Sequence, residues 1–147
     1  MSALFETNGG WVAFVLRIAL GVVFFAHGAQ LALGWFGGPG FKAAVESFKN
    51  MGMPSLIAAL AILAQFLGGL GLLAGFLTRI AAFGIFAVML GAIFLVHTKV
   101  GFFMNWYGQQ KGEGFEYHLL AIAMAIALMI AGAGNLSLDK MISGCLR

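Results

Sequence analysis

The sequence is poor in charge, with one cysteine and two prolines among its 147 residues. Charged residues make up 9% of the chain, whereas a soluble domain has about 25%. So few charges cannot cover the surface of a water-soluble domain, because such a surface needs many polar side chains. An ordinary soluble domain is therefore excluded.

The lone cysteine and the scattered basic residues exclude two further classes. Cys145 has no second thiol in the chain, so neither an internal disulfide nor a C-x-x-C redox pair can form. The net charge is only +3, and lysine and arginine stand singly, whereas nucleic-acid binding needs clustered basic residues. We expect no thiol–disulfide exchange within this chain and no nucleic-acid partner.

Apolar and small residues are abundant instead. Hydrophobic residues make up 62% of the chain, which includes 15 phenylalanines, 8 methionines and 22 glycines, and the mean hydropathy is +1.01. In lipid, helices associate through small residues that allow close backbone approach. We expect a single all-α membrane domain over residues 1–147, with the lipid bilayer as its solvent.

Four apolar segments are candidates to cross the bilayer, which takes about 20 residues each. They cover approximately residues 11–36, 54–77, 80–97 and 116–134. The second and third are separated by two polar residues, so they must be antiparallel neighbours. The predicted fold class is a transmembrane four-helix bundle with both termini on the same side.

The segment between the first two spans, residues 37–53, is more polar. Phe41, Val45 and Phe48 recur there at helical spacing, and charged residues occupy the other side. This pattern predicts a short interfacial helix that caps one mouth of the bundle. Lysine and arginine are spread nearly equally over the two sides, so charge alone gives no orientation.

Polar residues inside the spans are the best indicators of function, because they are costly in lipid. His27 lies about 13 Å from the loop side, and Gln65 about 16 Å from that side, at about 1.5 Å per helical residue. Gln30 shares a helix face with His27, so the three are predicted to form one hydrogen-bonding cluster. The alternative is that each forms an ordinary hydrogen bond between helices.

His97, Glu116 and His118 lie at span ends on one side, because a single loop joins the third span to the fourth. They could line a polar path from that surface toward the middle of the membrane. Glu116, working with His97, could instead accept a proton from a quinol or form a hydrogen bond with it. The alternatives are interfacial side chains and, for Glu116, a favourable charge at a helix N-terminus. No H-x-x-x-H or H-E-x-x-H spacing occurs, so no metal site is predicted.

Two arginines are expected at the side that carries the termini. Arg17 lies about 9 Å inside the first span, and we expect it to extend to the surface past the apolar residues. Pairing with Asp139, or binding an anionic lipid or substrate, are its alternatives. Arg79, in the tight turn between two spans, is expected to anchor lipid headgroups.

The order of several motifs resembles the DoxX family of small four-helix membrane proteins. The matching runs are RIALGVVFFAHGAQ, GWFGGPG, QFLGGLGLLAGFLTRIAAF, VML, HTKVGFF, GFEYHLL and GAGNLSLD. The resemblance implies a multi-pass protein of the inner (cytoplasmic) membrane of a bacterium, with cytoplasmic termini. It also implies an association with redox chemistry, because some relatives are subunits of a thiosulfate to quinone oxidoreductase.

The resemblance also marks recurrent positions and two departures from them. The recurrent positions are Arg17, His27, Gly28, Gln30, Gly68, Gly69, Arg79, His97, Glu116 and Asp139. Leu31 stands where relatives commonly have a lysine, and Gln65 where they commonly have a glutamate. Losing one member of a buried ion pair leaves the other unpaired, whereas losing both avoids that cost. We therefore hypothesise that relatives hold an ion pair between the first two spans, which this chain replaces by neutral groups.

Three functions follow from these observations. The first is a redox-associated subunit or anchor of a membrane oxidoreductase, with quinone as the candidate cofactor, bound by His27, Gln30, Gln65, His97 and Glu116. Any activity would then belong to a complex with a soluble or membrane redox subunit. The second is a non-enzymatic scaffold that docks a partner through the aromatic loop from Phe102 to Tyr107. The third is a small-solute transporter, which would require a homo-oligomer to form a pore.

Overall fold

The computed structural model describes residues 2–145, and these form helices and connecting turns without a strand. Three helices are long and apolar enough to cross a membrane: α2 (Gly10–Leu33), α4 (Ser55–Ala74) and α5 (Thr78–Leu95). A fourth, α6 (Glu116–Ala131), is equally apolar but has 16 residues. The predicted all-helical fold class is confirmed, whereas four crossings remain a prediction because α6 is short.

Glycines in left-handed conformation end two of these helices. α2 stops at Leu33 although the apolar segment continues to Phe36, because Gly34 adopts φ 74° and its N–H bonds to carbonyls of the last turn. Gly75, with φ 64°, ends α4 in the same way. A residue with a side chain rarely adopts this conformation, so glycine sets the exact helix end.

Close approach of backbones joins α2 to α4. A Cβ atom added to Gly28 would lie 2.4 Å from the Cα atom of Phe66, and one added to Gly69 would lie 2.3 Å from the backbone nitrogen of Phe25. Only glycine allows the two helices to come this near, as expected for helices that associate in lipid. α4 also contacts α5, α5 contacts α6, and α6 contacts α2.

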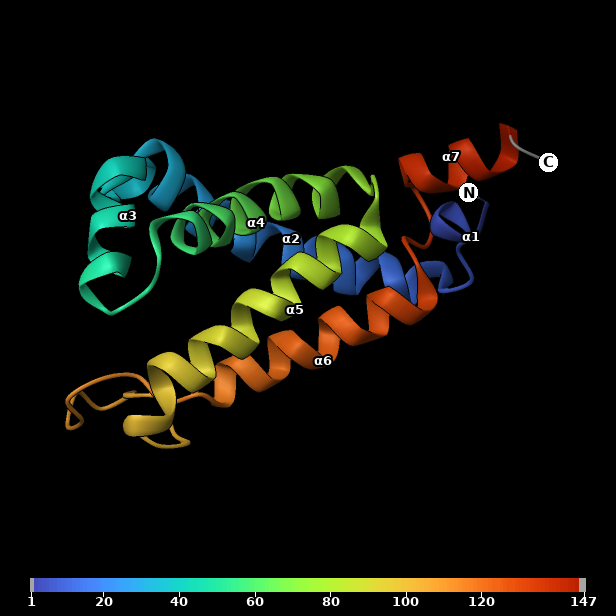
Figure 1. Cartoon of the computed structure of the whole chain (residues 1–147). Helices are drawn as coiled ribbons and strands as arrows, with labels where there is room; N and C mark the ends of the chain where they lie inside the picture. Colours follow the sequence, from blue (N-terminus) through green and yellow to red (C-terminus); the bar gives the residue numbers. More distant parts are fainter. Residues whose placement is uncertain (1, 146–147) are drawn as a thin grey trace.

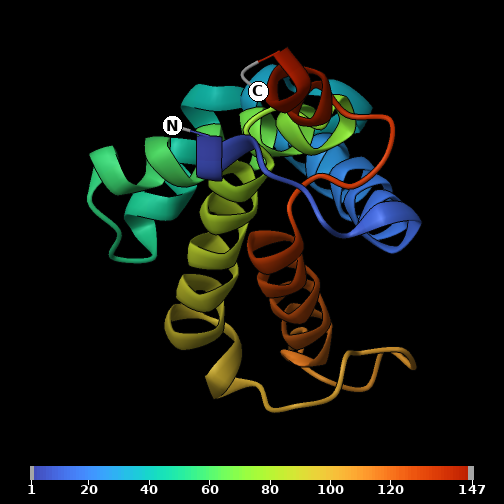
Figure 2. The ribbon, with the colours of Figure 1, turned by 90° about the vertical axis from the view of Figure 1, so that its right-hand side faces the viewer.

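The helices form two inclined pairs, α2 with α4 and α5 with α6, as both views show (Figures 1 and 2). The pairs meet near the two termini and diverge toward the opposite end (Figure 1). Apolar side chains from all four helices are buried between them, among them Phe24, Ile62, Ile85 and Leu128. The end at which the pairs diverge leaves space for a cavity.

Short helices lie at the two ends of the bundle. α3 (Gly40–Asn50), preceded by the 3-10 turn η1 (Trp35–Gly37), packs against α2 and α4. A helix therefore stands between the first two spans, and its place at the membrane interface stays a prediction. The 3-10 turn η2 (His97–Lys99) follows α5. At the other end, α1 (Ser2–Phe5) contacts α7 (Leu138–Cys145), so the two ends of the described chain lie together (Figure 1).

Candidate functional site

Arg17 is fully buried and does not reach the membrane surface. Its guanidinium donates only to backbone carbonyls: those of Leu72 and Leu73 in the last turn of α4, and those of Ala133, Asn135 and Leu136 in the link that follows α6. The last carbonyls of a helix have no partner within it and carry partial negative charge, so they hold a buried cation well. The prediction that Arg17 extends to the surface is therefore wrong.

Asp139 completes this junction from α7. It is buried, and its carboxylate accepts hydrogen bonds from the backbone N–H groups of Leu77, at 2.8 Å, and Thr78, at 2.9 Å. These groups begin α5, where a negative charge is favourable. Arg17 therefore donates to backbone carbonyls rather than to Asp139. Asp139 ties α7 to the start of α5, and Arg17 ties the link before α7 to the end of α4.

Arg79 turns toward the protein and not only toward lipid. Its guanidinium donates to the carbonyl of Met129, near the end of α6, and to the carbonyl of Glu6 at 3.1 Å. The expectation of a simple headgroup anchor is corrected accordingly. The carbonyl of Met129 is in the last turn of α6, where carbonyls lack a partner within the helix.

The predicted midplane cluster is not assembled. His27 is exposed on the outside of α2, and no hydrogen bond joins it to another of the described residues. The next residue, Gly28, faces α4, and successive helical residues are about 100° apart. Gln30 donates to the carbonyl of Phe36 at 3.5 Å. Neither His27 nor Gln30 forms a hydrogen bond with Gln65.

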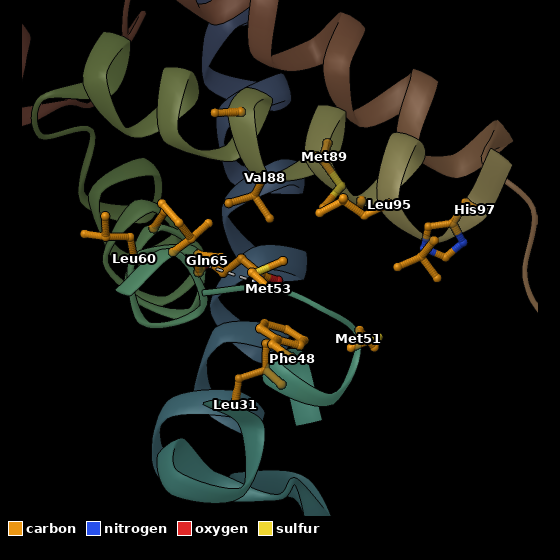
Figure 3. Close-up of a pocket in the computed structure, with 17 residues that line it drawn as sticks. Leu31, Phe48, Met51, Met53, Leu60, Gln65, Val88, Met89, Leu95 and His97 are labelled. Atoms are coloured by element: carbon orange, nitrogen blue, oxygen red, sulfur yellow. Dashed lines mark hydrogen bonds between the residues drawn. The ribbon is translucent and has the colours of Figure 1, made fainter. Parts of the chain in front are cut away.

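An apolar cavity of about 560 Å³ lies where the helix pairs diverge, between α3, α4 and α5 (Figure 3). Two lining side chains carry nitrogen or oxygen, Gln65 from α4 and His97 at the end of α5. Phe48, Met51 and Met53 close it from the side of α3. The structure thus places two of the five predicted site residues in the lining of one cavity, on different helices and apart from each other (Figure 3).

Gln65 belongs to the buried interior of the bundle. Its side chain is 8% exposed, and its Nε2 group donates to the carbonyl of Ala61, one turn earlier in α4, at 3.3 Å. Leu31, from α2, lines the same cavity (Figure 3). The two positions that depart from the family pattern therefore face one space.

His97 and His118 form a pair beside the cavity. Their ring centroids are 4.1 Å apart, and Nδ1 of His97 lies 2.7 Å from the backbone carbonyl oxygen of Glu113. His118 is 7% exposed, and its Nδ1 atom has no hydrogen-bond partner among residues 2–145. An orphaned polar atom in a buried place calls for an explanation, and function is one.

Glu116 organises the loop of residues 100–115. Its carboxylate accepts hydrogen bonds from the backbone N–H of Met104, at 3.0 Å, and from Nε1 of Trp106, at 2.8 Å. It begins α6, so the favourable charge at a helix N-terminus is also realised. Glu116 is absent from the cavity lining and has no hydrogen bond to His97.

Residues that the sequence analysis missed complete the cavity wall. The sequence assigned Phe48, Met51 and Met53 only to a segment at the membrane interface. The helical spacing that ends at Phe48 was a usable signal, because an apolar face must pack against something. Within residues 2–145, no three His, Cys, Asp or Glu side chains gather closely enough to hold a metal ion.

Known proteins with similar sequences include two from bacteria. The DoxX family model matches residues 12–98. A protein of Bacillus subtilis named "Putative oxidoreductase CatD" is 28% identical over 128 residues, which cover 87% of this chain and 84% of that protein. An Escherichia coli protein named "Inner membrane protein YqjF" is 29% identical over 129 residues, which cover 88% and 90%. No solved structure matches at a significant level.

Proposed function

This chain belongs to the DoxX family of membrane proteins, and we propose that it is a membrane subunit or anchor of a quinone-linked oxidoreductase. The cavity between α3, α4 and α5 carries this proposal. The relative from Bacillus subtilis bears the name of an oxidoreductase, which agrees with the proposal. Electrons would pass to or from a partner subunit of the complex.

The dimensions and chemistry of the cavity suit a quinone ring. Ligand pockets of about 300–1,000 Å³ with apolar walls and a few placed polar groups are typical of small-molecule sites, and this cavity has about 560 Å³. A bound quinone supplies reversible two-electron, two-proton chemistry. Apolar side chains of α4 and α5 would enclose its ring and tail and exclude water, and Gln65 and His97 would orient its oxygens.

We place the protein in the inner membrane of a bacterium, with its termini in the cytoplasm. The relative from Escherichia coli is named an inner membrane protein, which supports this location. The cytoplasmic termini follow from the family resemblance. The cavity would then lie toward the outer side of the membrane, with α3 and the loop of residues 100–115.

Copurification tests the quinone proposal. The protein is isolated in mild detergent, extracted with solvent and analysed by mass spectrometry for quinones. We expect a quinone in the wild type and in His27→Phe, which alters a side chain outside the cavity, and a loss of most of it in Gln65→Leu with His97→Phe. No quinone in the wild type, together with no binding of added quinone or hydroquinone, would refute the proposal.

A scaffold role is the second candidate, and the loop of residues 100–115 favours it. Trp106 and Tyr107 are 78% and 89% exposed, yet Glu116 holds this loop in a defined conformation. An ordered, exposed aromatic surface is typical of a docking site. The double variant Trp106→Ala with Tyr107→Ala should then lose a stoichiometric redox subunit from the purified complex while the cavity still binds quinone.

A further inference from the structure

The contacts of His97 determine which of its ring nitrogens a ligand can use. Nδ1 lies 2.7 Å from the carbonyl oxygen of Glu113. A carbonyl can only accept, so Nδ1 must carry the hydrogen and donate it. In a neutral imidazole the other nitrogen is then an acceptor. The lone pair of Nε2 accepts no hydrogen bond from the described residues, and the His97 ring lines the cavity.

His118 holds the His97 ring in this arrangement. The two rings are in contact, with centroids 4.1 Å apart, and His118 is itself buried in the first turn of α6. Turning the His97 ring over would exchange Nδ1 for a carbon and lose the hydrogen bond to Glu113. The hydrogen bond to Glu113 thus keeps Nε2 as the acceptor nitrogen of the His97 ring.

Gln65 adds a second acceptor. Its Nε2 group donates to the carbonyl of Ala61, which again can only accept. The oxygen Oε1 accepts no hydrogen bond from the described residues, so it is available to a ligand, as is the remaining N–H of the amide. Taken together, Gln65 and His97 have two acceptors and one donor that no described residue uses, and both side chains line the cavity.

We propose that this cavity selects the reduced, hydroxyl-bearing form of a lipophilic ring compound over its oxidised, carbonyl-bearing form. The inference rests on the proposed function and specifies which redox state of the ligand the cavity binds. A hydroxyl of the hydroquinone donates a hydrogen bond to Nε2 of His97. A quinone carbonyl has no hydrogen to donate, so its oxygen lone pair would face the lone pair of Nε2. A buried acceptor without a donor is costly, so a site built for a hydroxyl rejects an analogue that lacks its hydrogen.

Ligand binding in lipid nanodiscs under argon tests this preference. The probes are decylhydroquinone, decylbenzoquinone and the dimethyl ether of decylhydroquinone, which retains the ring and tail but has no hydroxyl. We expect decylhydroquinone to bind at least about tenfold more tightly than either of the others. The dimethyl ether lacks the hydroxyl hydrogens of the hydroquinone, so this comparison tests the hydrogen bond without altering the protein.

Two variants locate the preference at His97. His97→Phe removes the acceptor and keeps an aromatic ring, so the hydroquinone and quinone should then bind equally, within about twofold. His27→Phe, outside the cavity, should keep the wild-type ratio. Equal binding of all three probes to the wild type, or tighter binding of the quinone, would overturn the inference and leave the proposed function intact. Absence of binding by every probe would instead count against the proposed function.

Discussion

At the scale of single residues, Arg17 shows how a charge can lie inside a membrane bundle. Five carbonyls surround its guanidinium, two from the last turn of α4 and three from the link between α6 and α7. The planar fork of arginine presents five N–H donors, which suits such a set better than the single ammonium of lysine does. Arg17 is therefore a structural clamp between helices that are far apart in the sequence.

Replacing Arg17 tests this role. Arg17→Leu should lower the free energy of unfolding by about 3–5 kcal/mol, because it removes the donors from a buried polar cluster. Arg17→Lys should cost less but still be measurable, since it keeps the charge and loses the fork. Unfolding in detergent is followed by circular dichroism. Lys42→Met, on the exposed side of α3, is the control, and an effect of Arg17→Leu no larger than this control would contradict the role.

At the scale of helices, the contact between α2 and α4 depends on two glycines, one in each helix. Gly28 and Gly69 let the two backbones approach to distances that a methyl group would prevent. The motif was visible in the sequence as small residues within apolar spans. Which of the 22 glycines are needed is visible only from the neighbours of each one.

Two helical glycines make a matched comparison. Gly28→Ala should destabilise the protein by about 1–3 kcal/mol, because its methyl group would meet the backbone of Phe66. Gly91→Ala, in α5, has no neighbouring atom within 4 Å to meet and should stabilise by up to about 1 kcal/mol through helix propensity. Thermal unfolding of both variants measures these changes. Changes of stability in the same direction in both variants would contradict the close packing at Gly28.

The cavity wall also tests the hypothesis about an ion pair in relatives. Leu31→Lys alone should lower the free energy of unfolding by about 3 kcal/mol, the cost of an unpaired charge within the membrane. Adding Gln65→Glu should recover most of this loss, because both side chains line the same cavity. Chemical unfolding of both single variants and the double variant measures the coupling. Equal damage from Leu31→Lys with and without Gln65→Glu would reject the pairing.

At the scale of the whole molecule, the two ends of the bundle are different in character. One end gathers α1, α7 and the buried Arg17 and Asp139, and it is closed by hydrogen bonds. The other end carries α3, the cavity and the loop of residues 100–115, and there the helix pairs diverge. The candidate cavity therefore lies at the open end, and the closed end holds the bundle together.

The lone cysteine makes the topology testable. Cys145 is exposed at the closed end, and with cytoplasmic termini it should resist a membrane-impermeant maleimide in intact cells and react after permeabilisation. Gln109→Cys, placed on Cys145→Ser, should react in intact cells, because the loop of residues 100–115 lies at the opposite end of the bundle (Figure 1). Labelling of both positions from the same side would refute four crossings.

The sequence by itself determined the solvent and the class of fold. A chain with 9% charged and 62% hydrophobic residues can satisfy its backbone in lipid only by regular secondary structure, and the long apolar segments made that structure helical. The short helix after α2, the tight turn between α4 and α5 and the family were also evident from residue patterns, because each depends on neighbours in sequence.

Only the tertiary structure decided which polar residues share a site. His27 and Gln65 have similar depths, yet a rotation of one residue along α2 turns Gly28 toward α4 and His27 outward. Gln65 and His97 line one cavity because the helix pairs diverge, and Arg17 is buried because the end of α4 and the link after α6 both lie beside it. The depth of a residue in the membrane follows from its position along a helix. The direction in which its side chain points relative to the other helices depends on how the helices pack against each other.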